Sequence, residues 1–144
     1  MRTVCTLLAM VLLAGCNRAA KQPDTTTQTT LADRLQAIGP ADPAKYRRTT
    51  NMKHWRNPYL VVRADGVALV DFSNNEERIF KADELPDALA KLPASAWPYG
   101  RVVAVQENSV QGGTQDAVLI RRNRGILAGT LESMHVLINW VPSA

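Results

Sequence analysis

The sequence has very little cysteine, and both of its cysteines lie close to the N-terminus. Among 144 residues, only Cys5 and Cys16 are cysteines. The chain after Cys16 therefore cannot form an intrachain disulfide, although small exported domains often depend on such bonds. Its fold must be stabilised by packing and hydrogen bonding alone.

The apolar run at the N-terminus is too short to span a membrane. It extends from Val4 to Ala14, whereas a transmembrane helix needs roughly 20 residues. Arg2 precedes the run, and Leu13-Ala14-Gly15-Cys16 ends it. A positive charge, a short apolar run and small residues before a possible cleavage point are typical of an export leader. An uncleaved membrane helix is the alternative.

These residues resemble the signal of a bacterial lipoprotein with an intact Leu-Ala-Gly-Cys lipobox. The resemblance implies that Cys16 becomes the mature N-terminus and carries acyl chains such as palmitate. Several chains hold a protein firmly, since each buried CH₂ contributes about 0.8 kcal/mol. Asn17 stands where an Asp would resemble the retention signal of inner-membrane lipoproteins. We therefore expect a lipid anchor in the cell outer membrane, with the protein facing the periplasm.

Catalytic and metal-binding motifs are also missing. The sequence contains no HExxH, CxxC, Gly-x-Ser-x-Gly or phosphate-loop pattern, and its only histidines are His54 and His135. His135 falls in a predicted strand, which favours a half-buried structural role. Asp65, Asp71 and Glu107 lie near predicted strand ends, but sugar hydrolysis needs two carboxyl groups about 5 to 9.5 Å apart. We therefore expect no enzyme, no metal and no cofactor.

Charge is distributed unevenly along the chain. Residues 18–63 contain nine Lys/Arg and three Asp, a net charge of 9 − 3 = +6, and residues 64–144 contain seven Lys/Arg and ten Asp/Glu, a net charge of 7 − 10 = −3. One segment concentrates the basic side chains around an aromatic residue: Lys45, Arg47, Arg48, Lys53, Trp55 and Arg56. Such a segment suits an anionic lipid surface or wall polymer, and nucleic acid is not expected outside the cytoplasm. The alternatives are a solvated basic surface and, for the tryptophan, a lid on the core.

The chain is predicted to have four parts: a signal peptide (1–15), a lipidated cysteine with a flexible tether (16–29), a short helix with the basic segment (30–57) and an α/β domain (58–144). The tether is rich in Thr and Gln, which cannot bury a core. The short helix places Leu31, Leu35 and Ile38 on one face. That face either docks on the domain or lies on the membrane.

The pattern of the domain predicts a two-layer α/β sandwich with a mixed four-stranded sheet in ββαβαβ order and helices packed on it. The expected strands cover residues 59–63, 67–72, 101–106 and 134–141, and the expected helices cover residues 83–92 and 114–131. Asp65-Gly66 between the first two strands indicates a hairpin. Residues 79–80 are expected to be only a brief extended piece.

Two further features of the sequence allow more than one interpretation. Trp97 and Tyr99 flank Pro98, so they either stack on a sugar or partner strand or form a hydrophobic plug at a corner of the fold. Gly125 and Gly129 lie four residues apart in the long helix, which predicts close packing of that helix on the sheet.

From Tyr59 to Val141 the layout resembles the periplasmic domain of the ExbD/TolR family. The matching pieces are Val61-Val62-Arg63-Ala64-Asp65-Gly66-Val67, Glu84-Leu85 with Leu89, the 101–106 strand, the long helix and the last strand. That family works in energy-transducing envelope complexes, and some members associate with peptidoglycan. Its members carry an N-terminal transmembrane helix with an essential acid, where this chain has a lipobox. The resemblance therefore implies the fold and a binding habit only.

Taken together, these patterns predict a membrane-anchored envelope lipoprotein with a small non-catalytic domain. The expected ligand is cell-wall polymer such as peptidoglycan, or another envelope protein. The alternative is an enzyme or inhibitor that acts on cell-wall hydrolysis.

Overall fold

The computed structural model describes residues 33–108 and 113–142. The lipobox, the tether and the first residues of the short N-terminal helix lie outside the described residues. In the described ranges, no helix combines the length and apolar character needed to cross a membrane.

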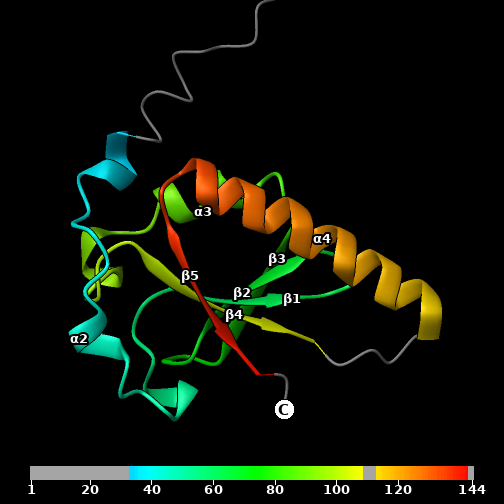
Figure 1. Ribbon diagram of the computed structural model, residues 1–144, viewed down its shortest axis with the longest axis horizontal. Helices are drawn as coiled ribbons and strands as arrows, with labels where there is room; N and C mark the ends of the chain where they lie inside the picture. Colours follow the sequence, from blue (N-terminus) through cyan, green and yellow to red (C-terminus); the bar gives the residue numbers. More distant parts are fainter. Residues whose placement is uncertain (1–32, 109–112, 143–144) are drawn as a thin grey trace, which may run out of the picture.

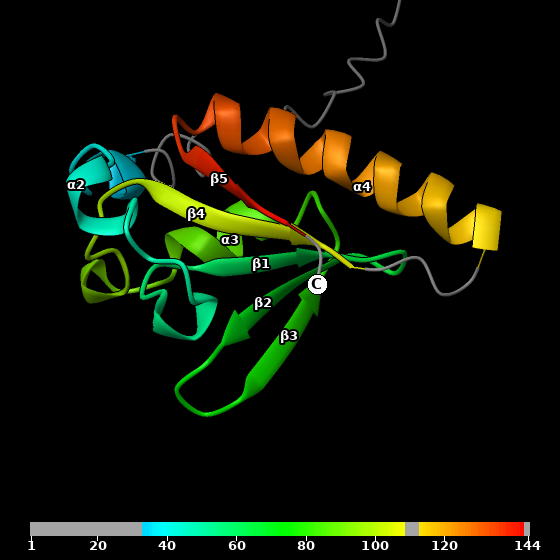
Figure 2. The same ribbon diagram turned by 60° about the horizontal axis from the view of Figure 1, so that its bottom comes forward.

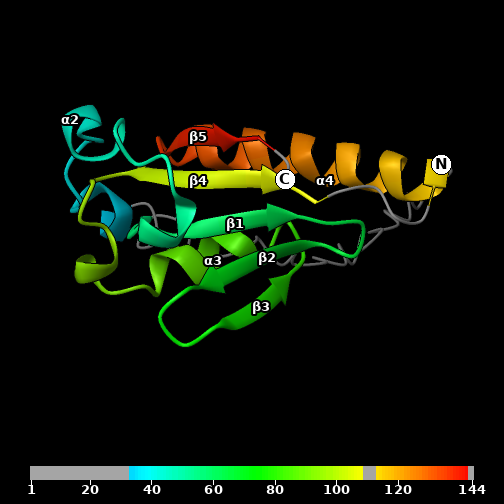
Figure 3. The same cartoon turned by 90° about the horizontal axis from the view of Figure 1, so that it is seen from below.

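The core of the fold is a five-stranded mixed sheet in the order β3-β2-β1-β4-β5 (Figure 3). The strands are β1 (Tyr59–Val62), β2 (Val67–Asp71), β3 (Glu76–Phe80), β4 (Val102–Glu107) and β5 (Leu137–Val141). β1 runs antiparallel to β2 and parallel to β4, β3 runs antiparallel to β2, and β5 runs parallel to β4. The α/β class and the mixed sheet agree with the prediction.

The predicted number of four strands is wrong, because residues 76–80 form a complete strand along β2. Its five residues pair with β2 from Val67↔Phe80 to Asp71↔Glu76. The Glu-Glu-Arg sequence at its start is exposed and has no apolar alternation. Backbone pairing with β2 at the sheet edge therefore accounts for this strand. The order of elements along the chain is βββαβαβ in place of the predicted ββαβαβ.

The first hairpin forms at the predicted Asp-Gly turn. Arg63 N–H donates to the Gly66 carbonyl at 2.9 Å and closes the turn. Gly66 has φ of +155°, and a Cβ at this position would collide with the backbone oxygen of Phe80. Glycine is therefore required both by the turn and by the close approach of β3.

Two helices cover one face of the sheet, α3 (Leu85–Ala90) and α4 (Gly113–Ser133) (Figure 2). Leu85 and Leu89 of α3 and Leu127 and Leu131 of α4 are fully buried, together with Ile120 at 5% exposure. They pack on the inward side chains of the strands, among them Leu60, Val62, Val67, Val103 and Val105. We call this the helix-covered face.

Gly125 and Gly129 do not pack on the sheet, contrary to the prediction. Both are exposed on the outer side of α4, and nothing would lie within 4 Å of a Cβ at either position. The helix presents Leu127 and Leu131 to the sheet instead. Because an α-helix has 3.6 residues per turn, the two leucines and the two glycines lie on different faces of α4.

The end of α4 corrects the prediction for His135. This residue is exposed and adopts φ of +55° in the turn before β5, so it is not a half-buried strand residue. Val136 N–H donates to Leu131 O and His135 N–H donates to Glu132 O, both at 2.9 Å. This is the Schellman arrangement, in which a residue in left-handed conformation ends the helix and the next one returns to the core.

The N-terminal segment packs on the domain, as the docking alternative for the short helix predicts. Residues 33–36 are helical, and Leu35 is 1% exposed within the core. Asp42 N–H donates to Tyr99 O at 2.8 Å, and Arg101 N–H donates to Gly39 O at 3.0 Å. These two hydrogen bonds fasten the chain before α2 (Pro43–Tyr46) to the entry of β4 (Figure 1).

Candidate binding pocket

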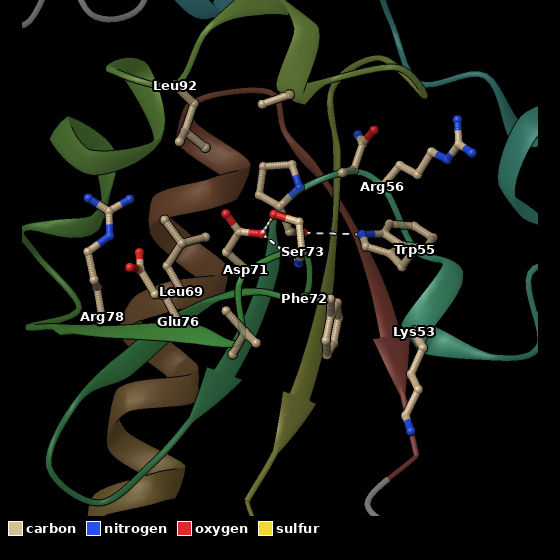
Figure 4. Close-up of a pocket in the computed structure, with 14 residues that line it drawn as sticks. Lys53, Trp55, Arg56, Leu69, Asp71, Phe72, Ser73, Glu76, Arg78 and Leu92 are labelled. Atoms are coloured by element: carbon tan, nitrogen blue, oxygen red, sulfur yellow. Dashed lines mark hydrogen bonds between the residues drawn. The ribbon is translucent and has the colours of Figure 1, made fainter.

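A pocket of about 450 Å³ opens where the β2–β3 hairpin meets residues 53–58 and the chain after α3 (Figure 4). Five charged side chains line it: Lys53, Arg56, Asp71, Glu76 and Arg78. Its volume lies in the range typical of small-ligand sites.

The apolar wall of the pocket comes from both sides of β2 and from the chain after α3. Leu69, Phe72, Leu92 and Ala96 contribute to this wall. Leu69 belongs to the core under the helices. Phe72 is 39% exposed, and its ring contacts that of Tyr59 edge-to-face with centroids 4.9 Å apart. The wall is thus partly rigid core and partly an aromatic ring open to solvent.

Asn57 holds the 53–58 side of the pocket in place. Asn57 is only 5% exposed. Its Nδ2 donates hydrogen bonds to Gly100 O and Val102 O, both at 2.7 Å. Its Oδ1 accepts from Tyr99 N–H at 2.9 Å. One amide therefore bonds three backbone groups at the entry of β4.

Asp71 is held by the turn that follows β2. Its Oδ1 accepts hydrogen bonds from the Ser73 backbone N–H at 2.9 Å and from the Ser73 hydroxyl at 2.6 Å. These hydrogen bonds, with the nearby Arg78, lower the pKa of Asp71 below its ordinary value. Asp71 is therefore a carboxylate at neutral pH, and it lacks the raised pKa of a general acid.

Two carboxylates face each other directly across the β2–β3 pair. Asp71 is the register partner of Glu76, and Arg78 follows Glu76 by two residues on the same side of β3. The five ion pairs found among the described residues involve neither Asp71 nor Glu76. Like charges directly opposite are unfavourable in a sheet.

The structure separates the predicted basic residues into two groups. Lys53 and Arg56 line the pocket, whereas Arg47 and Arg48 are exposed elsewhere on the segment. Lys45 lies 3.8 Å from Asp42 and donates a hydrogen bond to Pro98 O at 3.4 Å. The predicted segment therefore brings only Lys53 and Arg56 to the pocket, and its other basic side chains are exposed elsewhere.

The predicted aromatic residues lie mainly inside the fold. Trp55, Trp97 and Tyr99 are 4%, 3% and 9% exposed. Trp55 and Tyr99 contact each other edge-to-face with ring centroids 5.2 Å apart, and both contact Tyr46. Trp97 belongs to the core under the helices. Burial corresponds to the alternative interpretations, a lid for Trp55 and a plug for Trp97 and Tyr99. Trp55 nevertheless lines the pocket together with Lys53 and Arg56, whereas Trp97 and Tyr99 do not.

Most of the pocket lining was not predicted as a site, including Phe72, Ser73, Glu76 and Arg78. The sequence from Ser73 to Arg78 predicts a polar loop, and the pairing of β3 with β2 is what brings Glu76 and Arg78 to the pocket. A signal was available in Asp71-x-Ser73, since an Asp two residues before a serine is typical of an Asx turn.

The carboxylates considered for catalysis have separate partners. Asp65 lies 3.8 Å from Arg63, Glu107 lies 2.8 Å from Arg124, and Asp71 bonds Ser73. Across residues 33–108 and 113–142, no group of three His, Cys, Asp or Glu side chains is arranged to hold a metal. The pocket offers charge and apolar surface, which suit binding.

Comparison with protein-family models, with curated proteins and with solved structures gives no match to this chain. The residues and their geometry are therefore the basis for proposing a function.

Proposed function

We propose that the protein is a lipid-anchored module of the bacterial envelope whose domain binds cell-wall polymer without catalysing a reaction. The observation that supports this proposal is the pocket, which combines an apolar wall with side chains of both charges. Wall polymer presents sugars, aliphatic side chains, carboxylates and amines together. A surface with these complementary groups recognises such a polymer by contact and charge.

The basic segment adds long-range attraction to this site. Its five cationic side chains are exposed, and Lys53 and Arg56 reach the pocket itself. The positive potential of such a segment favours the approach of an anionic polymer. Attraction of this kind weakens with salt, because the screening length falls from about 10 Å at 0.1 M to about 3 Å at 1 M.

The proposed anchor places the wall within reach. Asp33, the first described residue, follows Cys16 by 33 − 16 = 17 residues. A chain of this length spans at most about 60 Å when fully extended. The domain of an outer-membrane lipoprotein would thus work close to its own membrane, where the polymer layer lies.

The anchor is tested by intact-mass analysis and membrane fractionation. Wild-type protein should carry an acyl mass on Cys16 and sediment with membranes, and Cys16→Ser should lose both properties. A soluble, unmodified wild type would refute the anchor while leaving the binding function open to test.

The binding function is tested by sedimentation of full-length protein, purified in non-ionic detergent, with isolated wall that has been stripped of protein. Wild type should co-sediment at low salt. Changing Lys45, Arg47, Arg48, Lys53 and Arg56 to Gln should weaken co-sedimentation at low salt and matter little at 1 M salt.

A matched control removes five exposed cations elsewhere: Arg34, Lys81, Lys91, Arg121 and Arg122. It has the same net charge as the test variant and should retain binding. No soluble wall fragments should be released during incubation. Wild type that stays in the supernatant would refute wall binding, binding that requires wall-associated protein would favour a protein partner, and fragment release would favour the enzymatic alternative.

A further inference from the structure

The charges of the pocket alternate in space. In the view of Figure 4, Arg78 lies on one side of the carboxylates Asp71 and Glu76, and Arg56 and Lys53 lie on the other. The lining therefore offers anionic positions flanked by cationic ones, with a net charge of 3 − 2 = +1. A ligand of a single charge sign meets repulsion from one of the two sets.

The two carboxylates form a position suited to an ammonium group. Asp71 and Glu76 are register partners across β2 and β3, and Asp71 is ionised because Ser73 bonds its oxygen. A cation that lies close to both carboxylates is attracted by each of them. Neither forms an ion pair with any other described residue.

The arginines beside them suit a carboxylate. A guanidinium group binds a carboxylate through two parallel hydrogen bonds, which an ammonium cannot do. Arg56 and Arg78 line the pocket, and neither takes part in an ion pair among the described residues. Arg78 lies 5.9 Å from the centroid of the Phe80 ring, and its charge also helps to lower the pKa of Asp71.

Apolar side chains line the same pocket as these charged positions. Leu69, Leu92 and Ala96 offer surface to a short methylene chain, and the volume of about 450 Å³ accommodates a group of amino-acid size. The ligand that satisfies all three features carries an ammonium and a carboxylate on an aliphatic chain.

We infer that this pocket recognises the zwitterionic end of a diamino acid in the stem peptides of the wall, with Asp71 and Glu76 facing its ammonium and Arg78, beside them, facing its carboxylate. This inference rests on the proposed wall binding and names the group that is bound.

The test uses three probes that share a carbon chain: 2,6-diaminopimelic acid, pimelic acid without the amines, and 1,5-diaminopentane without the carboxyl groups. Full-length protein in detergent is titrated by calorimetry and by amide NMR shifts at Ser73 and Glu76. Diaminopimelic acid should bind at least tenfold more tightly than either single-sign probe. Equal binding of pimelic acid, or no binding of diaminopimelic acid at millimolar concentration, would overturn the inference.

Variants separate the two charge positions. Asp71→Asn keeps the oxygen that Ser73 bonds, and Glu76→Gln and Arg78→Gln keep side-chain length. Each substitution should lower the affinity for diaminopimelic acid at least tenfold. The exposed controls Glu132→Gln and Arg121→Gln should leave this affinity unchanged. Unchanged affinity in the three pocket variants would assign the binding to another site and overturn the inference.

Wall sedimentation of the same variants distinguishes a failure of the proposed wall binding from a failure of the proposed ligand. If wild type and pocket variants sediment equally, wall binding stands and this inference is wrong. If wild type does not sediment, the proposed wall binding is wrong. The wall is then not the source of the ligand, even if diaminopimelic acid binds to the pocket. If wild type sediments and the pocket variants do not, both stand.

Discussion

The two faces of the sheet are covered in different ways. The helix-covered face is sealed by aliphatic side chains of α3 and α4, in regular 3.6-residue spacing. The opposite face carries an aromatic cluster supplied by the short helix α2, by β1 and by irregular chain: Tyr46, Tyr59, Trp55 and Tyr99. Figure 3 views this second face, which no long helix crosses. We call it the aromatic face.

The difference shows where a small domain keeps room for a ligand. Regular helices bury side chains continuously along the sheet, which favours stability. Irregular chain must satisfy its own backbone groups, as Asn57 does, and it leaves the pocket beside the free end of the β2–β3 hairpin. The four predictions below test this contrast, from the largest expected effect to the smallest.

Leu127→Ala tests the helix-covered face. Leu127 is 0% exposed, and removing a buried leucine side chain typically costs about 2–5 kcal/mol through lost burial and a cavity. Urea denaturation should show this loss. The neighbouring Ile126 is 40% exposed, so Ile126→Ala should cost less than about 1 kcal/mol. Equal effects would mean that α4 does not seal this face.

Asn57→Ala tests the aromatic face. It removes three hydrogen bonds and leaves the Gly100 and Val102 carbonyls and the Tyr99 N–H without this partner. We expect a loss of about 2–3 kcal/mol in urea denaturation. Asn74→Ala is the control, because the Asn74 side chain accepts a single exposed hydrogen bond, from Glu76 N–H. This substitution should lower the free energy of unfolding far less. A loss as small as that of the control would contradict the role given to Asn57.

His135→Gly tests how the covering helix ends. His135 has φ of +55°, a conformation that strains an L-residue and that glycine adopts freely. Substitution should raise the free energy of unfolding by about 0.5–1 kcal/mol, seen as a higher urea midpoint. His54→Gly, in the 3₁₀ turn Met52–His54, should have the opposite sign. A destabilised His135→Gly protein would contradict the proposed strain.

Ser73→Ala tests the charge at the open end of the pocket. Loss of the hydroxyl bond should raise the pKa of Asp71 toward its ordinary value, measured by NMR of its side-chain carboxyl carbon. Because the folded pKa is lowered, the stabilisation by ionised Asp71 is present above the ordinary carboxyl pKa and is lost as pH falls through the folded value. Asp71 is exposed, so the effect on stability at neutral pH should be the smallest of the four. Ser133→Ala, whose hydroxyl bonds Thr130 O, should leave the Asp71 pKa unchanged.

Much of the fold was accessible from the sequence, because local patterns carried it. The Asp65-Gly66 hairpin, the apolar stripe at Leu85 and Leu89 and the buried 102–105 strand all appear where their patterns predict them. β3 was missed because an exposed edge strand needs no apolar alternation. His135 was misplaced because the Schellman turn delays the start of β5 to Leu137.

The candidate site was much less accessible from the sequence. Its predicted part is Lys53, Trp55 and Arg56, which the sequence marks as basic residues around an aromatic residue. The sequence leaves both a binding pair and a plug open for Trp97 and Tyr99, because it does not show whether an aromatic ring is buried, and their burial corresponds to the plug.

The amino-acid sequence by itself determined the elements whose cause is local: turn glycines, helical stripes, buried apolar runs and the basic segment. Only the tertiary structure decided which side chains share the pocket. Asp71 and Glu76 become neighbours through strand register, and Arg56 reaches the same pocket because Asn57 fixes its segment to backbone more than 40 residues away, at Tyr99, Gly100 and Val102. Contacts over such separations depend on how the whole chain packs, and no local periodicity encodes them.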